Sequence, residues 1–169
     1  PTFKDNIFLI HLGMSGQIKI RDNFESIFKH DHVRVTIKSE NDKRYFITYN
    51  DPRRFGFIDL FHKKEINEHF LLKKLGVEPF EKNFNVGYLQ SMFDKKMKCI
   101  KDTLMDQSVI AGIGNIYASE ILFKAKVNPY RSAKTLNNEE IKSIIGATIE
   151  ILKKSINVGG TTLQNHSQP

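Results

Sequence analysis

Residues 106–120 read Asp-Gln-Ser-Val-Ile-Ala-Gly-Ile-Gly-Asn-Ile-Tyr-Ala-Ser-Glu and join two stretches with helical patterns. Gly112 and Gly114 permit positive φ angles and a close approach of the backbone to a ligand, and Asn115 is placed to cap the helix that follows. The free N–H groups at the start of a helix form a favourable phosphate site. The pattern alone favours a plain helix-turn-helix corner, because single glycine-spaced loops are weak motifs.

Helical periodicity surrounds this loop. Apolar residues recur at helical spacing between Ile141 and Ile156, after Asn137 and Glu140, which are spaced as a capping box, and before Gly159. We expect this helix to bury its apolar stripe in a core. Weaker patterns predict shorter helices at residues 66–75 before Gly76, at 86–93 and at 116–125.

The first sixty residues have a different pattern, with short runs of β-branched and aromatic residues that largely alternate with polar ones. The runs cover residues 7–12, 18–20, 33–37, 45–49 and 55–61. Turn-forming residues such as Asn50-Asp51-Pro52 separate them. Antiparallel strands followed by helices, without alternation, predict an α+β fold or two domains joined near residues 79–84.

Basic residues outnumber acidic ones along the chain. The 169 residues include 26 Lys and Arg against 19 Asp and Glu, a formal net charge of +7. Such a surplus favours a polyanionic partner, because phosphates are neutralised and their counterions released. The surplus is spread over both halves of the chain, which fits a basic groove built from both. A merely solvated surface gives the same composition.

Composition also excludes several classes of protein. No apolar run approaches the roughly 20 residues that a bilayer span needs, and no secretory leader pattern opens the chain. Cys99 is the single cysteine, so these residues cannot form an internal disulfide framework or a multi-cysteine zinc site. We therefore expect a cytoplasmic protein without a membrane partner.

Two loops between predicted strands carry side chains suited to DNA. In the loop at 11–16, Met14 lies between glycines at a strand end, where a long side chain projects outward unless it folds back on the core. In the loop at 50–56, Arg53 and Phe55 can hydrogen-bond a base and wedge between bases. Each loop alone is also compatible with an ordinary turn.

Taken together, these segments resemble the formamidopyrimidine-DNA glycosylases, which excise oxidised purines such as 8-oxoguanine and formamidopyrimidines. Six motifs match in the family's order: His-Leu-Gly-Met-Ser-Gly at 11–16, Lys-His-Asp-His at 29–32, Asp-Pro-Arg-Arg-Phe-Gly at 51–56, Leu-Gly-Val-Glu-Pro at 75–79, residues 106–120 and Gly-Gly-Thr-Thr-Leu at 159–163. The resemblance implies a truncated antiparallel β-sandwich domain at 1–81 and an all-helical helix-two-turn-helix domain at 82–169. Damaged double-stranded DNA would lie in a basic cleft between them.

The resemblance also implies roles for particular side chains. Once a damaged nucleotide has left the stack, Met14 would fill its place, Arg53 would hydrogen-bond the orphaned cytosine and Phe55 would wedge the opposite strand. This fits the few kcal/mol of stacking and pairing that flipping costs. Asn115 and Tyr117 match the phosphate-contacting positions. Three further matches to DNA contacts are His11, His30 and Lys96.

The chain departs from the family at its ends. The family's nucleophile is the proline of an amino-terminal Pro-Glu-Leu-Pro-Glu, whose secondary amine attacks the sugar, whereas this chain begins Pro1-Thr2-Phe3. Alignment on 11–16 places Pro1 inside the sandwich domain, so no residue here is assigned a catalytic or metal-ligating role. The family's four-cysteine zinc finger would follow Pro169. We therefore expect an internal part, inactive alone, of a monomeric bifunctional DNA glycosylase/AP lyase that binds zinc elsewhere and cleaves the abasic strand by β,δ-elimination.

Two other functions remain open from the sequence. One is an endonuclease VIII-type enzyme, which removes oxidised pyrimidines on the same fold but generally lacks the motifs at 11–16 and 51–56. The other is a non-catalytic nucleic-acid-binding module that keeps the helix-two-turn-helix and has lost its chemistry.

Overall fold

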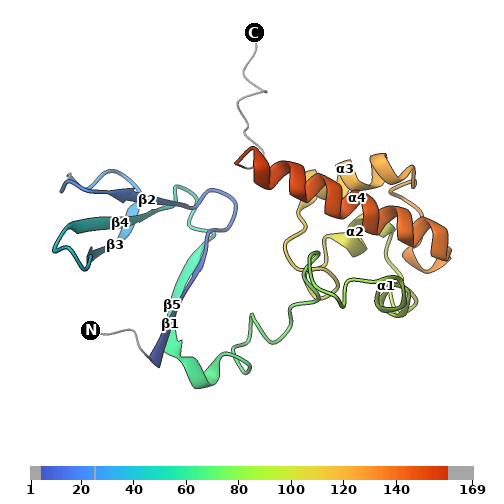
Figure 1. Cartoon of the computed structure of the whole chain (residues 1–169), viewed down its shortest axis with the longest axis horizontal. Coiled ribbons are helices and arrows are strands. Elements are labelled where there is room, and N and C mark those ends of the chain that lie inside the picture. The colour runs from blue at the N-terminus through green and yellow to red at the C-terminus, as the bar shows by residue number, and fades with distance from the viewer. Residues whose placement is uncertain (1–4, 25, 160–169) are drawn as a thin grey trace, which may run out of the picture. The chain divides into compact units, whose positions relative to one another are not determined.

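The computed structural model describes residues 5–24 and 26–159 (Figure 1). The chain divides into two compact units, Pro1–His69 and Phe70–Pro169. The first holds the strands and the second the helices, so the predicted α+β class is confirmed. This division falls earlier than the predicted domain boundary after residue 81.

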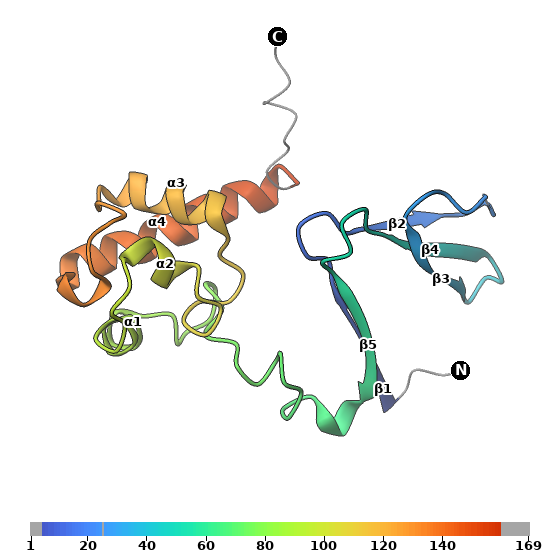
Figure 2. The same cartoon turned by 180° about the vertical axis from the view of Figure 1, so that it is seen from behind.

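The first unit contains two small antiparallel sheets within its described residues. β1 (Asn6–His11) pairs with β5 (Phe57–His62), and β4 (Arg44–Asn50) lies between β2 (Gln17–Arg21) and β3 (Asp31–Lys38). Figures 1 and 2 show both sheets from opposite sides. The strands coincide with the five runs predicted from alternation, within a few residues at each end.

The pairing of the strands brings two loops together. Residues 12–16 lead from β1 to β2, and residues 51–56 lead from β4 back to β5. Each of these loops passes from one sheet to the other. Since β1 pairs with β5 and β2 pairs with β4, the two loops cross between the sheets at the same place. In register, His11 faces Phe57 on one side of the crossing and Gln17 faces Asn50 on the other. The loops at 11–16 and 51–56 must therefore run side by side.

The helix predicted at 66–75 is absent from the described residues, and that prediction was wrong. The structure has a one-turn 3₁₀ helix, η2 (Lys63–Glu65), followed by turns. Gly76 serves a tertiary contact instead of a helix end: a Cβ there would lie 2.4 Å from the carbonyl oxygen of Val109. Its N–H donates to the carbonyl of Gln107 at 2.8 Å. Residues 76 and 77 therefore pack with the helices, which places the boundary between units before them.

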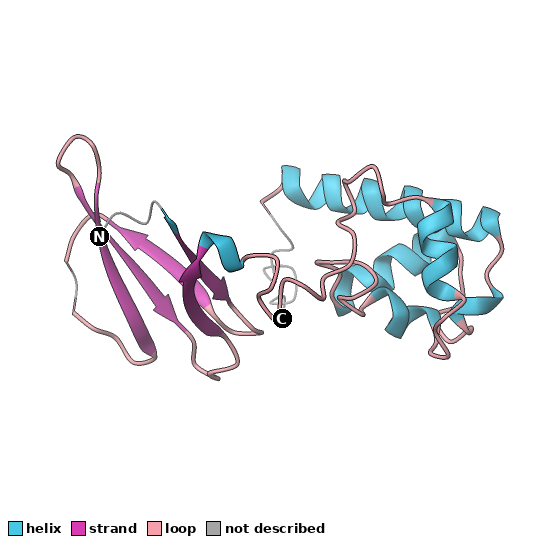
Figure 3. Ribbon diagram, turned by 90° about the horizontal axis from the view of Figure 1, so that it is seen from below, coloured by secondary structure: helices cyan, strands magenta, loops and turns pink. Residues whose placement is uncertain are grey.

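The second unit is helical in its described part (Figure 3). It comprises α1 (Val86–Phe93), α2 (Ile100–Leu104), α3 (Asn115–Ala125), η3 (Ala133–Thr135) and α4 (Asn138–Asn157). Its core consists of fully buried apolar side chains from every α-helix, including Leu89, Phe93, Leu104, Ile121 and Ile144. The helices predicted at 86–93, 116–125 and 141–156 are confirmed, whereas α2 and η3 are too short to show a helical period.

The long helix α4 begins as its sequence predicts. The Asn137 side chain accepts from the N–H of Glu140, and the Glu140 carboxylate accepts from the N–H of Asn137, each at 2.9 Å. This is a complete capping box. Gly159 follows the helix at φ +80°, a conformation that favours glycine. The rest of the motif at 159–163 lies outside the described residues, within which none of the helices is long and apolar enough to cross a bilayer.

Candidate nucleic-acid interface

The loops at 11–16 and 51–56, which we call the loop pair, touch through their backbones. Gly13 has φ +60°, and a Cβ on it would lie 2.7 Å from the carbonyl carbon of Phe55. From the opposite side, a Cβ on Gly56 would lie 2.4 Å from the carbonyl oxygen of His11. Any larger residue at these glycines would force the loops apart. The glycines of both motifs thus serve close contact between the loops.

Three of the predicted DNA-binding side chains project from the loop pair. Met14 is 78% exposed and Phe55 is 61% exposed, although both are large and apolar. The Arg53 guanidinium carbon lies 5.3 Å from the centre of the Phe55 ring, a cation–π distance. Exposed apolar side chains beside a guanidinium suit insertion between bases, where the apolar groups leave water and the cation meets base acceptors.

The carboxylate of Asp51 supports the loop pair from beneath. Its side chain is fully buried and accepts hydrogen bonds from the Ser15 hydroxyl at 2.5 Å, the Tyr49 hydroxyl at 2.9 Å and the Gly56 N–H at 2.9 Å. The bond from Ser15, followed by that from Gly56, holds the pKa of Asp51 well below its usual range. Asp51 is therefore ionised at neutral pH and offers four lone-pair sites to these donors.

The two predicted histidines lie near the loop pair. The His11 ring is exposed, stacks on Phe57 with centroids 5.3 Å apart, and its Nδ1 accepts from the Gly13 N–H at 3.2 Å. His30 is half-buried with φ 73°, and its carbonyl accepts from the Asp51 N–H at 3.0 Å. Both shape the backbone of the site. Their predicted contact with DNA remains a prediction.

In the helical unit, the glycine loop before α3 is held by a residue that sequence reasoning missed. The Gln107 amide accepts from the Gly112 N–H at 2.8 Å and donates to the Ile113 carbonyl at 2.9 Å. Gly112 has φ +85°, which explains the glycine. The signal in the sequence was weak, since a Gln five residues before a glycine belongs to no general turn motif. Its two bonds fix the path of the chain into α3.

The start of α3 differs from the expected geometry in one respect. Gly114 occupies the N-cap position, so Asn115 is the first residue of the helix and does not cap it. Among the described residues, no side chain hydrogen-bonds as a cap here and the first turn contains no acidic residue. Asn115 is exposed. The first N–H groups of α3, with the positive end of its dipole, are thus open to an anion.

The remaining two predicted contacts are engaged within the protein. The Tyr117 hydroxyl hydrogen-bonds the Ser155 hydroxyl and ties α3 to α4. Lys96 lies outside the helices and pairs with Asp106 through a 2.7 Å contact between Nζ and Oδ2. The Lys96 ammonium, and after it the Ser108 hydroxyl, lowers the pKa of Asp106 to about 2. Lys96 therefore holds Asp106 at the start of the segment that leads to the glycine loop. Its contact with DNA remains a prediction.

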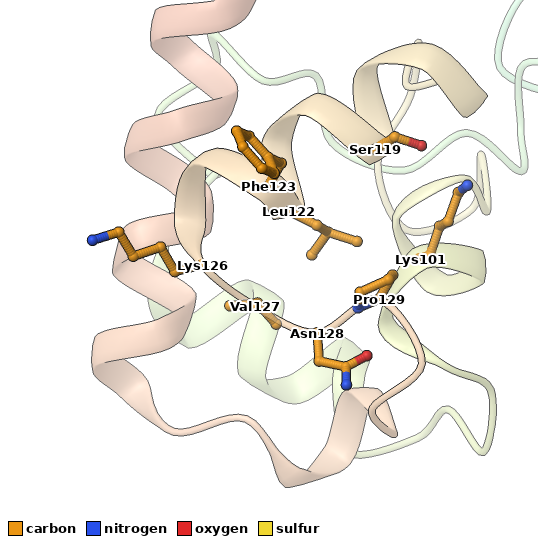
Figure 4. Close-up of a pocket in the computed structure, with 8 residues that line it drawn as sticks. All are labelled: Lys101, Ser119, Leu122, Phe123, Lys126, Val127, Asn128 and Pro129. Carbon is orange, nitrogen blue, oxygen red and sulfur yellow. The ribbon is translucent and has the colours of Figure 1, made fainter.

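A pocket of about 520 Å³ lies at the other end of α3. Figure 4 shows the side chains that line it, among them Leu122, Phe123 and Lys126 near the end of α3 and Pro129 after it. The carboxyl end of a helix carries the negative end of the dipole, so this end of α3 is less suited to a phosphate than the Asn115 end. We assign the pocket no part in the site.

A unit of antiparallel strands that carries the loop pair, followed by a helical unit with a glycine loop before α3, makes this a two-unit protein of the α+β class. The family model for the formamidopyrimidine-DNA glycosylase H2TH domain matches residues 75–167, and the model for the amino-terminal domain of the same enzymes matches residues 2–58. The chain belongs to the formamidopyrimidine-DNA glycosylase family.

Individual relatives agree with this assignment. The formamidopyrimidine-DNA glycosylase of Zymomonas mobilis is 42% identical over 167 residues, covering 98% of this chain and 59% of the relative. That of Ruthia magnifica is 43% identical over 166 residues, with the same two coverages. The Lactococcus lactis enzyme, in a crystal structure bound non-covalently to DNA containing an AP site, superposes with a TM-score of 0.83 at 34% identity, covering 98% of this chain and 62% of that one. The chain thus spans about three fifths of the length of these relatives.

Proposed function

We propose that the protein to which this chain belongs acts in base-excision repair, where it excises oxidised purines such as 8-oxoguanine and formamidopyrimidine from duplex DNA. We further propose that it cleaves the resulting abasic strand by β,δ-elimination, as an AP lyase. Family membership supports the glycosylase activity. The likeness to Lactococcus lactis enzymes bound to AP-site DNA and to Fapy-dG containing DNA supports damaged duplex DNA as the substrate.

The part of this function that we assign to these residues is binding and distortion of the duplex. The observation that carries it is the loop pair, where Met14, Arg53 and Phe55 project from two touching loops within one compact unit. Turning a nucleotide out of the stack costs a few kcal/mol of stacking and pairing. Apolar side chains inserted into the gap recover part of that cost, and the Arg53 guanidinium offers donors to the base left unpaired.

The second part of the proposal is the binding of a DNA phosphate at the start of α3. The open N–H groups at the start of α3, beside the Asn115 amide, would hold a phosphate through hydrogen bonds and the helix dipole. The formal net charge of +7 supports this grip through counterion release. Neither contribution depends on base sequence, so this contact should position the duplex without selecting the lesion.

The chemical steps are assigned to none of the residues of this chain. The resemblance implies zinc in the full-length protein, yet across residues 5–24 and 26–159 no three His, Cys, Asp or Glu side chains are grouped to hold a metal ion. The only cysteine is Cys99. The described residues therefore do not fit that zinc site, and we propose that the metal and the catalytic groups are supplied by other parts of the protein.

Two measurements test the proposal. The 169-residue chain should bind a duplex with a tetrahydrofuran abasic site opposite cytosine more tightly than the same undamaged duplex, at one fixed salt concentration because affinities for DNA vary steeply with salt. Equal affinities would refute the proposed insertion of the loop-pair side chains into the duplex.

For the whole protein, borohydride should trap a covalent adduct on an 8-oxoguanine duplex. Absence of an adduct with retained binding would favour a non-catalytic DNA-binding module. A preference for oxidised pyrimidines would favour an endonuclease VIII-type activity.

A further inference from the structure

Asp51 is a charged residue with 0% of its surface exposed. Aspartate is almost never fully buried unless its charge is paired or hydrogen-bonded. An ionised carboxylate taken from water loses several kcal/mol of solvation unless hydrogen bonds or charges replace it. In this unit the replacement comes from hydroxyl and N–H groups of β4 and of the two loops. Burial of Asp51 therefore depends on a complete set of hydrogen-bond donors around its carboxylate.

These donors are divided between the two loops. Oδ1 accepts from the Ser15 hydroxyl at 2.5 Å and from the Arg53 N–H at 3.3 Å. Oδ2 accepts from the Gly56 N–H and the Tyr49 hydroxyl, each at 2.9 Å. Ser15 is the partner from the loop at 11–16, 36 residues away in sequence, while the others come from β4 or from the loop at 51–56.

The backbone of Asp51 is held as well. Its N–H donates to the His30 carbonyl at 3.0 Å, and its carbonyl accepts from Nε2 of His32 at 2.7 Å. His30 directly precedes β3 and His32 is its second residue, so a third segment fixes the position from which the carboxylate reaches Ser15. Because neither end of Asp51 is free to shift, its bond to Ser15 sets the position of one loop against the other.

Resting on the proposed function, we propose that Asp51 is a positioning residue that locks the two loops together, so that Met14 enters a duplex with Arg53 and Phe55 as one preformed group. The Gly56 N–H, next to Phe55, donates to this carboxylate. The Arg53 N–H is shared between the carboxylate and the Ser15 hydroxyl, each at 3.3 Å. The Ser15 hydroxyl, next to Met14, donates to the carboxylate too. Binding then loses less free energy to the ordering of the inserted side chains.

The chain offers a matched pair of substitutions. Ser15→Ala and Tyr49→Phe each remove one hydroxyl donor from the same buried carboxylate, and Ser15→Ala also removes the acceptor that the Ser15 hydroxyl offers to the Arg53 N–H. Only Ser15 links the other loop, because Tyr49 lies two residues from Asp51 on β4. The proposal expects Ser15→Ala to reduce the preference for abasic over undamaged duplex by roughly tenfold, the size of one charge-assisted hydrogen bond. Tyr49→Phe should reduce that preference much less.

Hydrogen exchange of the DNA-free chain provides a readout that does not depend on DNA binding. In Ser15→Ala, amide exchange should accelerate in residues 11–16 and 51–56 together, while in Tyr49→Phe it should accelerate only in 51–56. Faster exchange in 11–16 alone after Ser15→Ala would overturn the inference, as would equal losses of abasic preference in both variants. If the unsubstituted chain shows no preference for abasic duplex, the proposed function fails. The locking of the two loops by Asp51 is refuted separately if Ser15→Ala does not accelerate amide exchange in residues 11–16 and 51–56 together.

Discussion

The backbones of Gly13 and Phe55 approach so closely that a Cβ on the glycine would lie 2.7 Å from the carbonyl carbon of the phenylalanine. Real Cβ atoms do not tolerate this distance, and the φ of +60° at Gly13 adds strain for any other residue. The contact exists because β1 pairs with β5 while β2 pairs with β4, which forces the two crossings together. The contact between the two loops therefore depends on the pairing of the strands as well as on the glycines within the loops.

Gly13→Ala should separate the loops and lower the affinity for abasic duplex by roughly fivefold or more, because strain of roughly 1–3 kcal/mol falls on the site. Fluorescence anisotropy with abasic and undamaged duplexes measures the effect. A substitution of the same kind at Gly146, where a Cβ meets nothing within 4 Å, serves as the control. Unchanged abasic affinity in Gly13→Ala would show that close packing of the loops is dispensable.

Phe55→Ala or Met14→Ala should weaken binding to abasic duplex by roughly tenfold and binding to undamaged duplex much less, because wedge contacts form only once a nucleotide has left the stack. Since both side chains are mostly exposed, the free energy of unfolding should change by no more than about 0.5 kcal/mol. Titration of each variant against both duplexes checks the result. Parallel losses on the two DNAs would contradict a wedge role.

Asn115→Ala should weaken binding to abasic and undamaged duplexes alike, by roughly fivefold, the size of one lost hydrogen bond. The residue is exposed at the first position of α3 and is not needed as its cap, so the helix should remain intact by circular dichroism. Affinities measured on both duplexes at equal salt test this. A loss confined to the abasic duplex would argue against a phosphate contact.

Local patterns in the sequence were sufficient for most of the fold and for the choice of loops. Alternation located the strands, and Asn137 with Glu140 located the start of α4. The failures share a cause in tertiary structure: Gly76 resembles a helix end but is required by its approach to Val109. Asp51 looked like a turn residue, because its role emerges only when strand pairing brings Ser15 beside it. The ion pair of Lys96 with Asp106 was likewise invisible in a run of neighbouring lysines.

Gly146→Ala should stabilise the helical unit by about 0.5–1 kcal/mol, because alanine has the higher helix propensity and loses less backbone entropy on folding. Gly146 is exposed within α4, and a Cβ there has open space around it. Urea unfolding followed by circular dichroism at 222 nm reports mainly on this unit, which contains the α-helices of the described chain. Destabilisation would mean that the exposed face of α4 packs against something else.

Asp106→Asn should destabilise the helical unit by about 2 kcal/mol at neutral pH, because the charged partner of Lys96 is lost and hydrogen bonds to a charged group are worth roughly 1.5–3 kcal/mol.

The pKa of Asp106 is lowered from 3.8 to about 2 by Lys96 and then by Ser108. A depressed carboxyl pKa stabilises the folded state above the unfolded value, and this contribution disappears as pH falls through the folded one. The difference between the two proteins should therefore be full above about pH 5 and shrink as the pH falls from about 5 to 2. Urea unfolding at several pH values measures it, with Glu139→Gln as the control, since Glu139 pairs with Lys142 on the exposed surface. A difference that persists unchanged to pH 2 would show that Asp106 stabilises the loop through its shape and not its charge.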